Sequence, residues 1–143
     1  MVDDVTYGKW WVEVRQCLAD LSSRQAHAID VFHPVTCNCG GNVFDVDVDA
    51  DLGAARTICS RSCGRLRLLI DSEEKWCRAR PQRWACPCGC RYANVALGFT
   101  LQYQGRSIRL VYLGVRCAAC SATSCCADWK IGYEPSLYLM DKW

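Results

Sequence analysis

The cysteines between residues 86 and 120 constrain the fold of this chain more than any other sequence feature. Cys86 and Cys88 lie one residue apart and are followed by a glycine, and Cys117 and Cys120 close the stretch two residues apart. Apolar alternation and a Gln-Gly turn separate the pairs, which is typical of a β-hairpin with four thiols at its base. Four thiolates in tetrahedral geometry bind Zn²⁺ well, so the spacing predicts a structural zinc site.

The same arrangement occurs earlier in the chain. Cys37 and Cys39 match the first pair, including the glycine that follows, and Cys59 and Cys63 close this earlier unit. Three residues separate the closing pair here instead of two, so the repeat is imperfect. The sequence predicts a second four-thiolate site and therefore two structural zinc ions per chain.

Paired cysteine knuckles at the ends of short hairpins resemble the zinc-ribbon fold group, in which two such knuckles clamp one structural zinc. The resemblance covers residues 37 to 63 and 86 to 120 and concerns spacing only. With the strand and helix patterns it leads us to expect an α+β, mainly β chain of tandem zinc ribbons with an N-terminal helix packed on them. We expect a helical segment at 1–36, a first ribbon at 37–80, and a second ribbon with a C-terminal cover segment at 81–143.

The ligand sets remain open to substitution. The usual knuckle of the zinc-ribbon group has two residues between its cysteines, whereas each first knuckle here has one. Cys90, Cys125, Cys126 or His33 could therefore replace one of the eight assigned thiols.

Residues 9 to about 28 form the clearest helix candidate, because Trp10, Val14 and Leu18 recur on one side at helical spacing. We expect this helix to pack on the first ribbon. Two adjacent tryptophan rings cannot both point inward, which makes Trp11 a candidate anchor for a partner.

From Phe44 the sequence FDVDVDAD alternates strictly between apolar and acidic residues, which predicts a strand with one acidic face. Its aspartates at alternate positions are Asp45, Asp47 and Asp49. A half-exposed strand normally carries polar residues on its outer face, so solvation alone explains the acidic row. The functional alternative is that these three carboxylates dock a basic partner surface.

Charge is unevenly distributed along the chain. Residues 1 to 54 hold three Lys/Arg against nine Asp/Glu, a net charge of −6, and residues 55 to 91 hold nine against three, a net charge of +6. The basic segment contains Arg56, Arg61, Arg65 and Arg67. With the tryptophans of the same segment these arginines could bind nucleic acid, while the overall charge of only +2 argues against it.

In the second unit, an alternating strand from about residue 94 to 103 precedes a return strand, Ile108 to Val115, that is apolar on both faces. Such a strand should be central and covered on each side, by the first unit or by the C-terminal segment. Arg80-Pro81-Gln82 is the expected linker between the units.

The thirteen cysteines and the lack of a signal-peptide or membrane-spanning pattern favour a reducing, cytoplasmic location without a membrane partner. Motifs such as HExxH, GxSxG and a phosphate-binding glycine loop are absent. A non-catalytic protein-binding module, of the kind of a small bacterial inhibitor or immunity protein, is the favoured interpretation. A nucleic-acid-binding zinc protein and an enzyme with a site assembled between the two units remain as alternatives.

Overall fold

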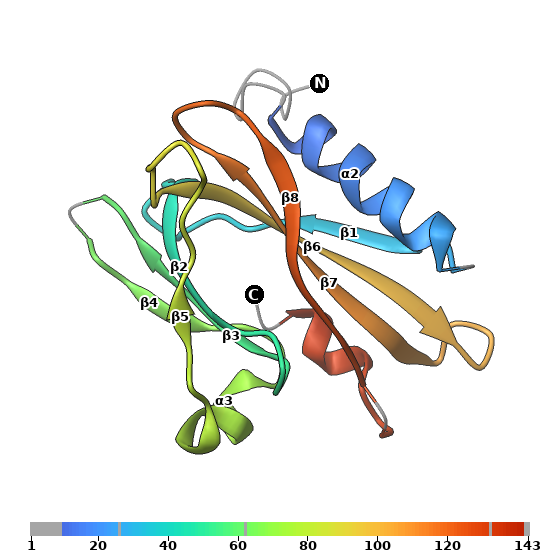
Figure 1. The fold of residues 1–143 in the computed structure, drawn as a ribbon. Helices are drawn as coiled ribbons and strands as arrows, with labels where there is room; N and C mark the ends of the chain where they lie inside the picture. Colours follow the sequence, from blue (N-terminus) through green and yellow to red (C-terminus); the bar gives the residue numbers. More distant parts are fainter. Residues whose placement is uncertain (1–9, 26, 62, 132, 142–143) are drawn as a thin grey trace.

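The computed structural model describes residues 10–25, 27–61, 63–131 and 133–141, and this part of the chain is α+β and mainly β (Figure 1). The strands are β1 Val31–Pro34, β2 Phe44–Asp49, β3 Ala54–Cys59, β4 Leu66–Leu68, β5 Gln82–Arg83, β6 Ala93–Gln102, β7 Ser107–Cys117 and β8 Thr123–Lys130. The helices are α2 Trp10–Arg24, α3 Ser72–Lys75, and the 3-10 turns η1 Trp76–Arg78 and η2 Leu137–Asp141. None of these described helices has the length and apolarity that crossing a bilayer requires.

All eight strands belong to one antiparallel sheet. Six of them follow the order β4-β3-β2-β6-β7-β8, while β1 pairs with β6 and β5 pairs with β2. Its two halves, β2–β4 and β6–β8, meet at a single residue pair, Phe44 opposite Ala93. β7 lies between β6 and β8, which confirms the prediction of a central strand. The hairpin of β6 and β7 pairs from Ala93 and Cys117 at the knuckle end to Gln102 and Ser107 at the turn.

The internal repeat produces an exchange of strands between the two units. β1, which precedes the first knuckle, pairs with β6 of the second unit, and β5, which precedes the second knuckle, pairs with β2 of the first. The N–H of Val35 donates to the carbonyl of Val95, and the N–H of Trp84 donates to the carbonyl of Val46, both at 2.8 Å. The two bonds are related by the same sequence offset that relates Cys37 to Cys86, so each unit completes the sheet of the other.

The linker segment takes part in this exchange. Gln82, which the sequence places in the linker, begins β5 and lies opposite Val48 of β2.

The main core lies between the two halves of the sheet. Phe44 and Val46 are buried, as the alternation of β2 predicts, and they join apolar residues of the long hairpin such as Phe99 and Val111. Leu139 of η2 belongs to the same core, so the C-terminal segment covers part of the sheet.

α2 ends earlier than the sequence pattern suggests. The carbonyl of Ser22 accepts hydrogen bonds from the N–H groups of Gln25 and His27, each at 3.0 Å, and this turn takes the chain out of the helix at Arg24. Residue 9, the predicted first residue of the helix, lies outside the described residues.

The expectation that α2 packs on the first ribbon is wrong. α2 contacts β6, β7 and β8 of the second unit. Two glycines on that face provide the space: a Cβ on Gly114 would lie 2.7 Å from Cγ1 of Val14, and one on Gly98 would lie 3.2 Å from Cδ1 of Leu18. The helix therefore lies where the hairpin lacks side chains.

Candidate metal centres

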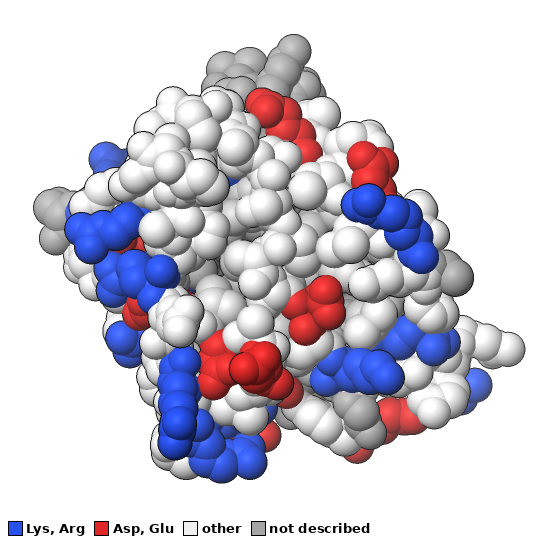
Figure 2. Space-filling model, viewed as in Figure 1, with Lys and Arg blue, Asp and Glu red and all other residues white. Residues whose placement is uncertain are grey.

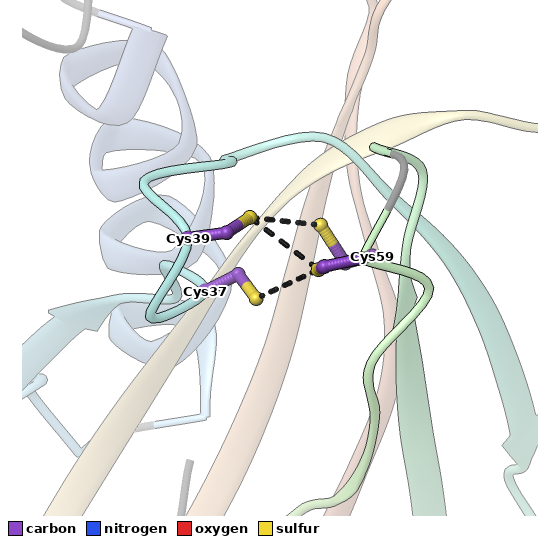
Figure 3. Close-up of side chains that lie close together, drawn as sticks. Cys37, Cys39 and Cys59 are labelled. Atoms are coloured by element: carbon purple, nitrogen blue, oxygen red, sulfur yellow. Dashed lines mark hydrogen bonds between the residues drawn. The ribbon is translucent and has the colours of Figure 1, made fainter.

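The first candidate centre brings together Cys37, Cys39, Cys59 and Cys63. Cys37 and Cys39 lie in the loop between β1 and β2, Cys59 is the last residue of β3, and Cys63 lies in the loop before β4. The sulfurs of Cys37 and Cys63 are 3.5 Å apart. The sulfur of Cys39 lies 3.6 Å from that of Cys59 and 3.4 Å from that of Cys63. Figure 3 shows the side chains of Cys37, Cys39 and Cys59 converging on one small volume.

The second candidate centre brings together Cys86, Cys88, Cys117 and Cys120. The sulfurs of Cys86 and Cys120 are 3.6 Å apart, and those of Cys88 and Cys117 are 3.5 Å apart. The structure thus groups the two sets of four thiols that the spacing predicts, with all ligand atoms of each set within 4.8 Å of one another.

These dimensions fit a tetrahedrally bound zinc ion. With Zn–S bonds of about 2.3 Å, tetrahedral geometry places neighbouring sulfurs about 3.8 Å apart. A disulfide would need an S–S distance of about 2.05 Å, and all thirteen cysteines are free. Four thiolates are also the donors that a borderline-soft cation such as Zn²⁺ prefers, so the residues fit the metal.

Backbone N–H groups of the knuckles lie close to the cysteine sulfurs and favour their negatively charged form. Gly40 and Gly89 follow the first cysteine pairs with φ values of +90° and +99°, a conformation that favours glycine. In the closing knuckle of the second centre, the N–H groups of Ala119 and Cys120 point at the sulfur of Cys117, at 3.4 and 3.5 Å. Such N–H···S hydrogen bonds stabilise thiolate ligands.

The thiol pKa values show how these hydrogen bonds and burial compete. The N–H of Gly41 helps to lower the pKa of Cys39 to about 7, and the N–H of Cys120 helps to lower that of Cys117 to about 6. Burial raises the pKa of Cys59 to about 12. One thiol in each centre therefore ionises readily, whereas full ionisation needs the positive charge of a bound metal ion.

The alternative ligands lie outside both clusters. Cys90 accepts a hydrogen bond from the N–H of Tyr92 at 3.4 Å, and Cys125 and Cys126 donate to backbone carbonyls of the sheet. His33 lies edge-on to the ring of Phe99, with ring centroids 6.0 Å apart.

The acidic row of β2 contacts arginines and backbone amides of its own chain. Asp47 is 5% exposed and binds Arg56 at 2.8 Å and Arg83 at 2.5 Å. Arg83 also binds Asp45 at 3.2 Å, while Asp49 accepts hydrogen bonds from the N–H groups of Leu52 and Arg80. The sequence did not reveal Arg83 as a partner, because the contact depends on the exchanged strand β5.

The predicted anchor Trp11 is half-buried on α2, and its ring packs beside Phe32 of β1 at a centroid distance of 6.4 Å. Its helix packs on the second unit, whereas the acidic row belongs to β2 of the first. The structure therefore does not combine Trp11 and the aspartates into one surface.

The basic segment divides into internal and exposed arginines. Arg56 binds Asp47 and stacks on Trp76, with its Cζ 5.1 Å from the ring centroid. Arg61 and Arg65 are exposed, and Arg67 is half-buried. Figure 2 shows Lys and Arg side chains along the flank that carries β4 and β5 in Figure 1.

Comparisons with protein-family models, curated proteins and solved structures found no match. The likeness to the zinc-ribbon group therefore rests on the cysteine spacing and on the geometry of the two thiol clusters.

Proposed function

We propose that this chain is a non-catalytic protein-binding module whose fold is stabilised by two structural zinc ions. The ligands of the first are Cys37, Cys39, Cys59 and Cys63, and those of the second are Cys86, Cys88, Cys117 and Cys120. The observation that carries the proposal is that each centre offers four protein thiols. A four-coordinate site filled by thiolates leaves no position for water or substrate, which is the arrangement of structural rather than catalytic zinc.

Catalysis by a bound metal ion would need a further group of ligating side chains with an open coordination position. Within the described ranges, these two clusters are the only groups of three or more His, Cys, Asp or Glu side chains that could hold a metal ion. The function that we propose is recognition of another protein, and inhibition of a partner enzyme, as by a bacterial immunity-type protein, is one form of it. We place this function in the cytoplasm, where free thiols persist.

The surface beside the first centre favours a protein partner. Leu66, close in sequence to Cys63 and opposite Ile58, is a large apolar side chain that is 48% exposed. Exposed Arg61 and Arg65 make no ion pair with a described carboxylate. An apolar anchor beside cations without an ion-pair partner suits an acidic protein surface, because charge complementarity steers association and apolar contact supplies affinity.

Zinc content is the first test. Elemental analysis of purified protein should find two zinc ions per chain, and chelation should unfold it, because structural zinc sites contribute roughly 10–16 kcal/mol of apparent binding free energy. Cys88→Ser should lower stability strongly, whereas Cys17→Ser, at a cysteine outside both clusters, should lower it little. Well-folded protein without bound metal would contradict the structural role.

Partner binding is the second test. Tagged zinc-loaded protein should retain a specific protein from its native cells at physiological salt, and the two purified proteins should reform a stoichiometric complex. Tight binding to mixed-sequence DNA or RNA at the same salt, lost when Arg65 and Arg67 are replaced, would instead establish the nucleic-acid function.

A further inference from the structure

β4 is an outer strand of the sheet with one hydrogen-bonding side open. It pairs with β3 through Thr57 and Arg67, and no described strand pairs with its other side. The N–H of Cys59 donates to the carbonyl of Arg65, and the N–H of Leu69 donates to the carbonyl of Ala55. In an antiparallel ladder these odd-numbered residues of β4 face β3, so the backbone groups of the even-numbered residues point outward.

The outward groups belong to Leu66 and Leu68. Their two N–H and two C=O groups form a template to which an extended segment can add as a further strand. The side chain of Leu66 is 48% exposed and lies opposite Ile58 of β3, so an apolar side chain of an added strand would find a neighbour there.

The opposite face of β4 is basic. Side chains alternate between faces along a strand, so Arg65 and Arg67 lie on the other side from Leu66. Arg61 precedes them in the exposed loop of the first metal centre. A strand added to β4 would therefore meet apolar residues on one face and positive charge on the other.

β1, β5 and β8 also pair with only one described strand each, and β8, at the far end of the sheet, is built differently from β4. Its pairing with β7 shifts register between Leu113 and Gly114, where Cys126 is the extra residue of a β-bulge. Bulges interrupt the regular ladder that strand addition needs. β4 has no such irregularity in its register.

A second copy of this chain is a poor occupant of the edge. Antiparallel pairing of two β4 strands about Arg67 would place the two arginines directly opposite each other, and like charges in that position are destabilising. The basic face is instead complementary to carboxylates.

We propose that β4 is the docking edge for the partner, and that the partner supplies an extended segment in which acidic and apolar residues alternate. This inference rests on the proposed protein-binding function and names the chemistry of the partner. The aspartates of β2 have no part in it, because they contact groups of their own chain.

The direct test uses a blocked peptide of alternating valine and glutamate, added at millimolar concentration to zinc-loaded protein and followed by NMR. The amide signals of Leu66 and Leu68 should shift, and cross-strand contacts should appear between them and the peptide. A peptide with lysine in place of glutamate should bind at least about tenfold more weakly, a difference of about 1.4 kcal/mol. The absence of peptide-induced shifts on β4 would overturn the inference.

Leu66→Pro separates backbone docking from side-chain contact. The substitution removes an N–H that does not bond to β3, and proline is tolerated on an outer strand whose N–H faces solvent. Peptide binding should be lost while zinc content and the β2–β3 amide signals stay unchanged. Leu66→Ala, which keeps the N–H, should bind more weakly than wild type but better than Leu66→Pro.

Charge reversal gives the matched control. Arg65→Glu should weaken peptide binding, whereas Arg106→Glu, at an exposed arginine in the distant turn between β6 and β7, should not. If Leu66→Pro keeps the protein partner captured from cells, the docking edge is wrong and the protein-binding function stands. If neither peptide nor protein partner binds the wild-type chain, both proposals fail.

Discussion

Asp47 belongs to the acidic row of β2, and its carboxylate forms ion pairs with Arg56 and Arg83. Burial would raise the pKa of its carboxyl group, but hydrogen bonds from Arg83 and Arg56 outweigh burial and hold the pKa below its ordinary value of 3.8. The carboxylate is therefore ionised at neutral pH and connects β2 to β3 and β5. The predicted partner-binding carboxylate of Asp47 thus has two arginines of its own chain as ion-pair partners.

Replacing Asp47 by asparagine should destabilise the zinc-loaded protein by about 1–3 kcal/mol, because two guanidinium groups lose a charged acceptor. A group with a lowered folded-state pKa contributes its stability above its unfolded pKa and loses it as the pH falls through the folded-state pKa. Urea unfolding at pH 7 therefore measures the whole contribution. Asp51→Asn, at an exposed aspartate in the turn between β2 and β3, is the control and should change stability by less than about 0.5 kcal/mol. Equal stabilities for the two variants would show that the buried pairs contribute nothing.

At the scale of elements, α2 depends on two glycines that have no side chain to displace it. A methyl group at Gly114 would lie 2.7 Å from Cγ1 of Val14 and 3.1 Å from both Cδ atoms of Leu18. These atoms belong to the small core under α2, so the helix would have to move outward or repack.

Gly114→Ala should accordingly lower the free energy of unfolding by about 1–3 kcal/mol, the usual effect of overpacking. The added methyl and the nearer methyl of Val14 compete for the same space. The double variant with Val14→Ala should therefore be more stable than the sum of the two single effects predicts. Denaturant unfolding of the four proteins measures this coupling, and strict additivity would mean that α2 is not seated on Gly114.

The elements that could be predicted from the sequence are those with local signals. Cysteine spacing predicts both thiol clusters, and the alternation around Phe44 and along β6 predicts the buried faces of these strands. β5 consists of only two residues, too short to show any periodicity, so its pairing with β2 could not be predicted. The ion pairs of Asp47 and the seat of α2 depend on contacts between distant segments, which no local pattern contains.

At the scale of the whole molecule, the exchange of β1 and β5 connects the two metal centres. The strand before the Cys37 knuckle is held by β6, whose own start follows the Cys86 knuckle. The strand before the Cys86 knuckle is held in the same way by β2, which follows the Cys37 knuckle. The side chain of Asn94 also donates to the carbonyl of Asn42 at 2.7 Å, next to the point where β2 and β6 meet.

This connection predicts that the two centres bind metal cooperatively. Loss of metal from the second centre should loosen β5 and the start of β6, and with them the support of β1 and of the Cys37 knuckle. Cys88→Ser should therefore weaken zinc binding at the intact first centre by about tenfold or more, and Cys39→Ser should weaken the second. Coupling between binding sites is reciprocal, so the two effects should agree in size when each variant abolishes binding at its own centre.

Competition with a chelator measures the zinc affinity of each remaining centre, and NMR of the cadmium-substituted protein shows which centre is filled. Cys77→Ser provides the control, because this exposed thiol belongs to η1 and to neither cluster. It should leave both affinities unchanged. If the first centre of Cys88→Ser binds zinc as tightly as that of the wild-type chain, the units are independent, and the exchanged strands serve only to complete the sheet. A matched loss of affinity in both directions would instead mean that the chain acts as one folding unit, in which each centre binds its metal more weakly when the other is empty.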